Sequence, residues 1–101
     1  MAKLITVQYF QGCPNYNLAV EHVAEALRRL GRGDVAVATE EIADEEQATR
    51  AGFRGSPTIL SDGVDPFADP AAPVGFACRV YDTPAGLAGA PSVEQLCEVL
   101  A

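Results

Sequence analysis

The sequence predicts an α/β fold: a four-stranded mixed sheet flanked by helices, in the order βαβ, α, ββ, α. Two observations predict it. Segments rich in β-branched and aromatic residues alternate with segments whose apolar residues recur every three to four positions. The 101 residues, 49% hydrophobic and 21% charged, have the size and composition of one globular domain spanning 1–101.

The first half of the chain is predicted to form a strand, a helix and a second strand. Residues 4–10, LITVQYF, have the composition of a buried strand. Apolar residues then recur at helical spacing up to Gly31: Val20, Val23, Ala24, Leu27 and Leu30. Residues 35–42 resume a strand pattern. Because a helix separates the two strands, we expect parallel pairing through a right-handed crossover.

The middle of the chain is predicted to hold a short helix and a third strand. Asp44 and Gln47 have the spacing of a capping box, and Gly52 stands where the helix would end. Residues 58–61 are a short, largely apolar run that stops at the turn signal Asp62-Gly63. This run is predicted to be the third strand.

The last third is predicted to complete a hairpin and add a helix. Residues 64–73 contain three prolines and two aspartates without periodicity, which indicates an extended loop. Residues 75–81 alternate and are predicted to be the fourth strand. One face carries Phe76, Cys78 and Val80, and the other carries Ala77, Arg79 and Tyr81. Ser92 and Gln95 form a second capping box before a last amphipathic helix.

Charge and cysteine usage exclude several classes of protein. The net charge of −7 disfavours phosphate backbones and anionic lipid surfaces, so neither nucleic acid nor membrane is an expected partner. The chain begins with a strand pattern instead of a signal-peptide core, which favours the cytoplasm. The three cysteines fit no zinc pattern and no paired framework, so we expect reduced thiols and no metal site.

Two short motifs carry a resemblance to a known family. Gly12-Cys13-Pro14-Asn15-Tyr16 follows the first strand, and Gly55-Ser56-Pro57-Thr58 precedes the third. With the element order, these motifs resemble the thioredoxin superfamily over nearly the whole chain. The stretches GCPN, GFRGSPTIL, DPFADP and ACRVY are similar to a compact set of thioredoxin-like proteins of about this size, some of which carry selenocysteine in the motif.

The resemblance implies a thioredoxin-like fold and a substrate site. It implies that Pro57 is cis and that the backbone of Ser56 lies beside Cys13, ready to pair with an extended thiol substrate. Gly12 and Thr58 complete the implied substrate-binding residues. The sequence departs from the family where Tyr16 replaces the second cysteine of the C-x-x-C motif, so a dithiol cycle confined to this motif is excluded.

Cys13 is the candidate nucleophile. We expect it at the N-cap of the first helix, with Pro14 at the first helical position, where a missing N–H costs nothing. The unbonded backbone N–H groups and the positive end of the helix dipole would then stabilise the thiolate over the thiol. The alternative is that Cys13 is only a small capping residue in a decayed site.

The roles of Cys78 and Tyr16 stay open at this stage, while that of Cys97 does not. Cys78 either resolves a mixed disulfide on Cys13 or is a small core residue. Tyr16 either donates a hydrogen bond to the Cys13 sulfur or packs. Cys97 is expected in the core of the last helix, beside Val93, Leu96 and Leu100.

Three basic or titratable side chains are further candidates. His22 lies on the polar face of the first helix and is expected to be solvated, which makes it a poor general base for Cys13. Arg54 and Arg79 are candidate anchors for the carboxylates of glutathione, with surface roles as the alternative.

The leading hypothesis is a single-cysteine thiol oxidoreductase. Cys13 would attack a disulfide or a glutathione mixed disulfide, and an external thiol would complete the cycle. Glutathione is then a co-substrate, no bound cofactor is expected, and the chain is a monomer or weak homodimer. The alternatives are a thiol or soft-metal binding module using Cys13 with Cys78, and a redox-inactive thioredoxin-fold adaptor.

Overall fold

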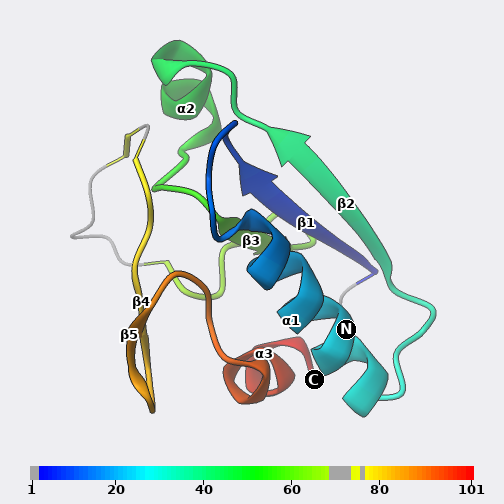
Figure 1. Ribbon diagram of the computed structural model, residues 1–101. Helices are drawn as coiled ribbons and strands as arrows, with labels where there is room; N and C mark the ends of the chain where they lie inside the picture. Colours follow the sequence, from blue (N-terminus) through cyan, green and yellow to red (C-terminus); the bar gives the residue numbers. More distant parts are fainter. Residues whose placement is uncertain (1–2, 69–73, 76) are drawn as a thin grey trace.

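The structure, a computed structural model, describes residues 3–68, 74–75 and 77–101. Over these residues the chain is mixed α/β, with three helices and five short strands (Figure 1). In chain order they are β1 (Leu4–Tyr9), α1 (Tyr16–Arg29), β2 (Ala36–Glu41), α2 (Glu45–Ala51), β3 (Thr58–Ser61), β4 (Tyr81–Thr83), β5 (Gly86–Ala88) and α3 (Val93–Leu100). The predicted first three strands and three helices are therefore confirmed.

The sheet topology is simple and partly as predicted. Among the described residues, β2, β1 and β3 form a three-stranded sheet with β1 in the centre. β1 pairs in parallel with β2, as the intervening helix predicted, and antiparallel with β3, where Gln8 lies opposite Thr58. β4 and β5 form a separate antiparallel pair.

The predicted four-stranded sheet and its hairpin of strands three and four are wrong. Within the described part of 75–81, β-pairing with the β3 side of the sheet is limited to one parallel bridge between Ser56 and Cys78. Val80 is 62% exposed and Cys78 is also exposed, so the predicted apolar face is not buried; Phe76 lies outside the described residues. Alternation predicts which residues share a face, but it does not choose the partner strand.

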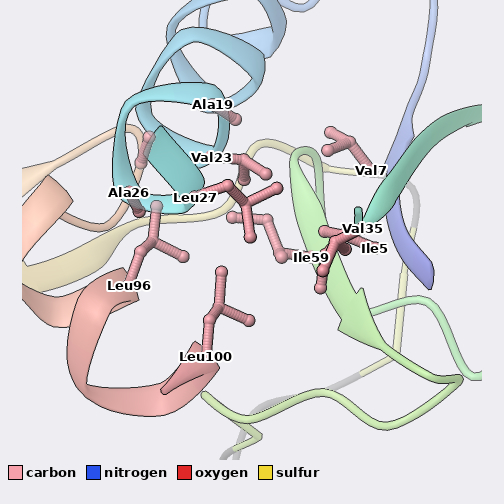
Figure 2. Close-up of a cluster of buried hydrophobic side chains, with 11 residues drawn as sticks. Ile5, Val7, Ala19, Val23, Ala26, Leu27, Val35, Ile59, Leu96 and Leu100 are labelled. Atoms are coloured by element: carbon pink, nitrogen blue, oxygen red, sulfur yellow. The ribbon is translucent and has the colours of Figure 1, made fainter. Parts of the chain in front are cut away.

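The core lies between the sheet and two helices. Its buried residues come from β1, α1, β3 and α3, together with Val35 and Ala90: Ile5, Val7, Ala19, Val23, Ala26, Leu27, Val35, Ile59, Ala90, Leu96 and Leu100. Figure 2 shows Leu96 and Leu100 of α3 pointing toward α1 and β3. α1 and α3 therefore cover the same face of the sheet, and burial of this apolar face is the main stabilising contribution.

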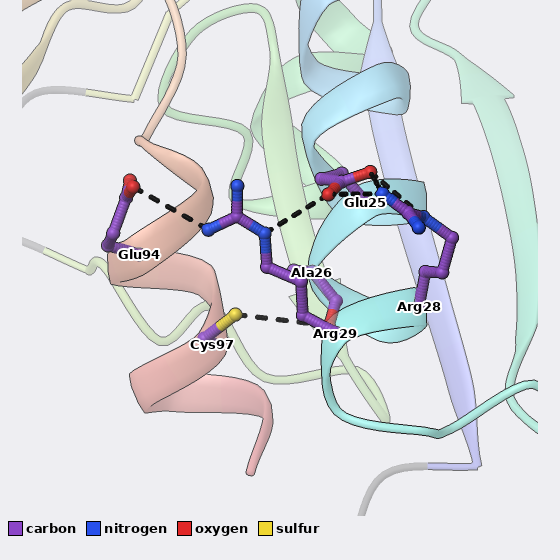
Figure 3. Close-up of polar contacts among 6 residues, drawn as sticks. All are labelled: Glu25, Ala26, Arg28, Arg29, Glu94 and Cys97. Atoms are coloured by element: carbon purple, nitrogen blue, oxygen red, sulfur yellow. Dashed lines mark hydrogen bonds and ion pairs between the residues drawn. The ribbon is translucent and has the colours of Figure 1, made fainter.

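Polar contacts join α1 to α3 at the edge of this core. Glu25 binds Arg28 and Arg29, and Arg29 also approaches Glu94 of α3 at 3.6 Å (Figure 3). Hydrogen bonds from Arg28 and then Arg29 hold the pKa of Glu25 below its usual range. The Cys97 thiol lies 3.9 Å from the Ala26 carbonyl and packs against the core, which confirms its predicted structural position.

The helix ends follow the predicted local signals. The Asp44 carboxylate accepts from the Gln47 N–H at 2.8 Å, and Gly52 ends α2 in the left-handed conformation with φ +65°. Ser92 and Gln95 make the reciprocal capping box of α3. Within the described ranges, no helix has the length and apolar character needed to cross a bilayer.

Candidate functional site

Cys13 lies in the turn that joins β1 to α1. Its backbone N–H donates to the Phe10 carbonyl at 3.2 Å, which closes the turn. Gly12 adopts φ +86°, a conformation that favours glycine over other residues. The Cys13 side chain is half-buried and its thiol is free. Cys13 is therefore partly accessible to solvent.

The prediction that Cys13 caps α1, with Pro14 as its first residue, is wrong. The N-cap is Asn15, whose carbonyl accepts the first helical bond from Ala19 at 3.1 Å. A side chain on Gly89 would overlap the Asn15 amide, so the absence of a side chain at position 89 gives Asn15 its place. The N-cap of α1 lies two residues after Cys13.

The N-terminal end of α1 is electrostatically open. Within the described residues the Asn15 side chain makes no capping hydrogen bond, and the first turn contains no acidic residue. The first N–H groups of a helix have no intrahelical partner, and the dipole of this 14-residue helix is positive at this end. Both features favour an anion close to the position of Cys13.

Tyr16, in place of the second motif cysteine, packs. Its ring stacks on Tyr9 at a centroid distance of 4.0 Å and lies against the main core. This contact ties the first turn of α1 to the end of β1. It favours the packing alternative for Tyr16.

Ser56 and Pro57 lie next to the turn of Cys13. The Ser56–Pro57 peptide bond is cis, as the resemblance implied, and both residues are buried. The Phe10 N–H donates to Ser56 Oγ at 3.4 Å. Because Phe10 also accepts from Cys13, one residue links the Cys13 turn to the Ser56-Pro57 segment.

The backbone of Ser56 is already paired within the chain. Its N–H donates to the Ala77 carbonyl at 2.8 Å, and its carbonyl accepts from the Arg79 N–H at 2.9 Å. Cys78 therefore stands opposite Ser56. The expected open edge for an extended substrate is wrong, because residues 77–79 occupy both hydrogen-bonding groups.

Thr58 and Tyr81 support the turn around Pro57. Thr58 is buried and its hydroxyl donates to the Gly55 carbonyl at 2.6 Å. The buried Tyr81 hydroxyl donates to the Pro57 carbonyl at 2.6 Å. Burial raises the pKa of Tyr81 above its usual range. Both side chains satisfy backbone groups of the segment, and Tyr81 is a site residue that the sequence did not single out.

Arg79 is engaged within the protein. Its guanidinium pairs with Asp65 at 2.7 Å, and the two side chains are only 10% and 14% exposed. It also donates to the Phe67 carbonyl at 2.7 Å and lies 4.6 Å from the centre of the Tyr81 ring. The suggestion that Arg79 anchors a ligand carboxylate is therefore wrong. The alternation that placed Arg79 and Tyr81 on one face was the signal for this contact.

An open groove of about 590 Å³ lies beside the paired segment. Its lining consists of Arg54, Phe67, Ala68, Gly75, Ala77, Cys78, Arg79, Val80, Tyr81 and Asp82. Within the described residues, Cys78 borders this groove while Cys13 does not. Arg54 lines the same groove as Cys78, and its role as a carboxylate anchor stays a prediction.

No protein-family model, curated protein or solved structure matches this chain.

His22 is half-buried, with Nδ1 2.8 Å from the Pro91 carbonyl, so the predicted solvated position is wrong. Over residues 3–68, 74–75 and 77–101 there is no group of three or more His, Cys, Asp or Glu side chains that could hold a metal ion.

Proposed function

We propose that the chain is a thioredoxin-like thiol oxidoreductase that uses Cys13 as its nucleophile. The observation that carries the proposal is the position of Cys13. This half-buried cysteine lies two residues before the N-cap of α1, and the N-terminal end of that helix has neither a side-chain cap nor an acidic residue in its first turn. The unpaired N–H groups and the positive dipole end of α1 favour negative charge near this turn. The thiolate is the reactive form in disulfide exchange.

The proposed reaction consists of two exchanges. The Cys13 thiolate attacks one sulfur of a mixed disulfide, so a bond forms to Cys13 while the other sulfur leaves as a thiolate and takes up a proton. An external thiolate, supplied by glutathione, then attacks the adduct and releases Cys13. Electrons and protons balance, and no resident cofactor is required.

The fold supports the resemblance behind this proposal. A βαβ unit and an antiparallel β3 put Cys13 at the exit of β1 and Pro57 immediately before β3. Hydrogen bonds from Cys13 to Phe10 and from Phe10 to Ser56 join the two motifs. The resemblance implied one part of this arrangement, the placement of the Ser56-Pro57 segment beside the turn of Cys13.

The occupied backbone of Ser56 favours small substrates. An extended polypeptide would have to displace residues 77–79 to pair with Ser56 by strand addition. A glutathione mixed disulfide needs only access to the Cys13 sulfur. We therefore propose glutathione mixed disulfides as the substrate class, which places the activity in a reducing compartment such as the cytoplasm.

The test compares reactivity and turnover in matched cysteine variants. At neutral pH, Cys13 should alkylate faster than free glutathione, and reduction of a glutathione mixed disulfide should be lost in Cys13→Ser. Cys97→Ser is the control, because Cys97 lies at the α1–α3 contact, and it should keep full turnover. Alkylation of Cys13 no faster than the free thiol, with no turnover, would exclude the proposal.

A further inference from the structure

Two tyrosines join the ends of the loop that carries Cys13. Tyr9 is the last residue of β1 and Tyr16 is the first residue of α1, so residues 10–15, the Cys13 loop, connect them. The two half-buried rings stack with a centroid distance of 4.0 Å and an interplanar angle of 25°. Stacked aromatic pairs contribute stabilisation beyond the burial of their area. The tyrosine pair, Tyr9 with Tyr16, therefore connects the end of β1 directly to the first turn of α1.

Each member of the tyrosine pair is fixed by a different part of the fold. The Tyr9 carbonyl accepts from the Ile42 N–H at 2.7 Å, and Tyr9 lies opposite Glu41 in the β1–β2 register. Tyr16 packs against the main core, which α1 shares with the sheet and α3. Because the sheet fixes Tyr9 and the core fixes Tyr16, the stack sets the separation between the two ends of the Cys13 loop.

The beginning of the Cys13 loop is fixed by hydrogen bonds. The Cys13 N–H donates to the Phe10 carbonyl at 3.2 Å, and Gly12 supplies a φ of +86° at the third position of this turn. The Phe10 N–H lies 3.4 Å from Ser56 Oγ. The turn is thus tied at Phe10, while on the other side of Cys13 the chain continues into the helix that Tyr16 begins.

The position of the helix end matters because its effect on a charge has a short range. The positive end of a helix dipole acts mainly within the first turn. At α1 this turn contains no acidic residue, and the N-cap Asn15 makes no side-chain capping bond. Tyr16 is the first residue of the turn. The packing of its ring therefore bears directly on how close the open end of α1 lies to Cys13.

We propose that Tyr16 is a positioning residue for Cys13, and that it acts through its stack on Tyr9. The stack keeps the N-terminal end of α1 beside the turn of Cys13, where it favours negative charge on the sulfur. This inference rests on the proposed function of Cys13 and adds no covalent step to it. It gives the residue at the second cysteine position of the motif a role that depends on its ring and not on its hydroxyl.

The experiment measures alkylation of each cysteine by iodoacetamide at pH 7, resolved by peptide mapping. Tyr16→Leu removes the ring and keeps an apolar side chain. The rate at Cys13 should fall about two- to fivefold, which corresponds to the interaction of a charge with a helix end, while the rate at the exposed Cys78 stays unchanged. Reduction of a glutathione mixed disulfide should fall by the same factor. Tyr16→Phe keeps the stack and should retain the wild-type values.

Two further variants show whether the effect depends on the tyrosine pair. Tyr9→Leu should lower the Cys13 rate as Tyr16→Leu does, and the double variant should lower it no further, because the two residues act through one contact. Leu30→Ala is the matched control. Leu30 is half-buried and packs against the same core, but it is the C-cap of α1 at the opposite end of the helix. It should leave the Cys13 rate unchanged.

The outcomes separate this inference from the proposed function. A wild-type Cys13 rate in Tyr16→Leu would overturn the positioning role and leave Cys13 as the nucleophile. An equal fall in Tyr16→Phe would assign the effect to the hydroxyl and also overturn it. A joint rise at Cys13 and Cys97 would indicate general loosening of the fold, with the same consequence. If wild-type Cys13 reacts no faster than free glutathione and shows no turnover, the proposed function and this inference are both excluded.

Discussion

Replacement of Gly55 by alanine tests how residues 77–79 are held against Ser56. Gly55 has φ +117°, which L-amino acids rarely adopt. A Cβ atom at this position would lie 2.9 Å from Arg79 Cβ and 3.1 Å from the Ala77 carbonyl oxygen. Because these atoms belong to the main chain or are attached directly to it, side-chain rotation cannot relieve the contact. The segment must move away from Ser56.

The magnitude follows from two costs. A non-glycine residue held at such a φ costs on the order of 1–3 kcal/mol. Loss of the two backbone hydrogen bonds at Ser56 costs about 1–3 kcal/mol more, while alanine recovers about 0.4–1 kcal/mol through the unfolded chain. We therefore expect Gly55→Ala to lower the free energy of unfolding by roughly 1–5 kcal/mol.

Urea denaturation of three glycine variants separates these costs. Gly63 has φ +85° with no atom within 4 Å of the added Cβ, so Gly63→Ala carries only the conformational cost. Gly33 has neither feature, and Gly33→Ala should change stability by less than about 0.5 kcal/mol. Gly55→Ala should also speed amide hydrogen exchange at Ser56. If its stability matched that of Gly63→Ala, the packing argument would be refuted.

Three further predictions concern Tyr81 and the Cys13 turn. Tyr81→Phe leaves the Pro57 carbonyl without its buried donor, so urea midpoints should show a loss of about 1–3 kcal/mol. Burial raises the pKa of Tyr81 in the folded protein, while in the unfolded chain the side chain ionises at about pH 10. The free energy of unfolding should therefore fall as pH rises above that value. That fall should be shallower in Tyr81→Phe; equal slopes would contradict the assignment. Gly89→Ala should displace Asn15 and change the alkylation rate of Cys13 without altering that of Cys97, measured by peptide mapping.

Much of the fold was predictable because its signals are local. The N-caps of α2 and α3 depend on residues three positions apart: Ser92 and Gln95 form the full capping box, and at α2 Asp44 caps the Gln47 N–H while the Gln47 side chain binds the Ala43 N–H instead of closing the box. The first strand and the first helix were visible in residue type and spacing. The hairpin of strands three and four failed because residues 75–81 carry a strand pattern whose partner is chosen by distant residues.

The candidate site was predicted in outline and corrected in detail. The neighbourhood of Cys13 and Ser56 followed from the motifs, and Phe10 connects them. The N-cap of α1 is Asn15 and not Cys13, and the Asn15 side chain packs against Gly89, a contact that no local pattern indicates. The Ser56 backbone, expected to be open, is paired with residues 77–79, which lie about 20 positions away in sequence.

The sequence by itself determined the elements whose stabilising contacts lie within a few residues: the helix caps, the amphipathic faces of α1 and α3, and the thiol in the turn after β1. Only the tertiary structure decided which segment pairs with Ser56, where Cys78 lies, and that Arg79 is bound to Asp65. These contacts join parts of the chain that are far apart in sequence. Their free energy comes from burial and hydrogen bonding across the assembled fold, which residue type and spacing do not specify.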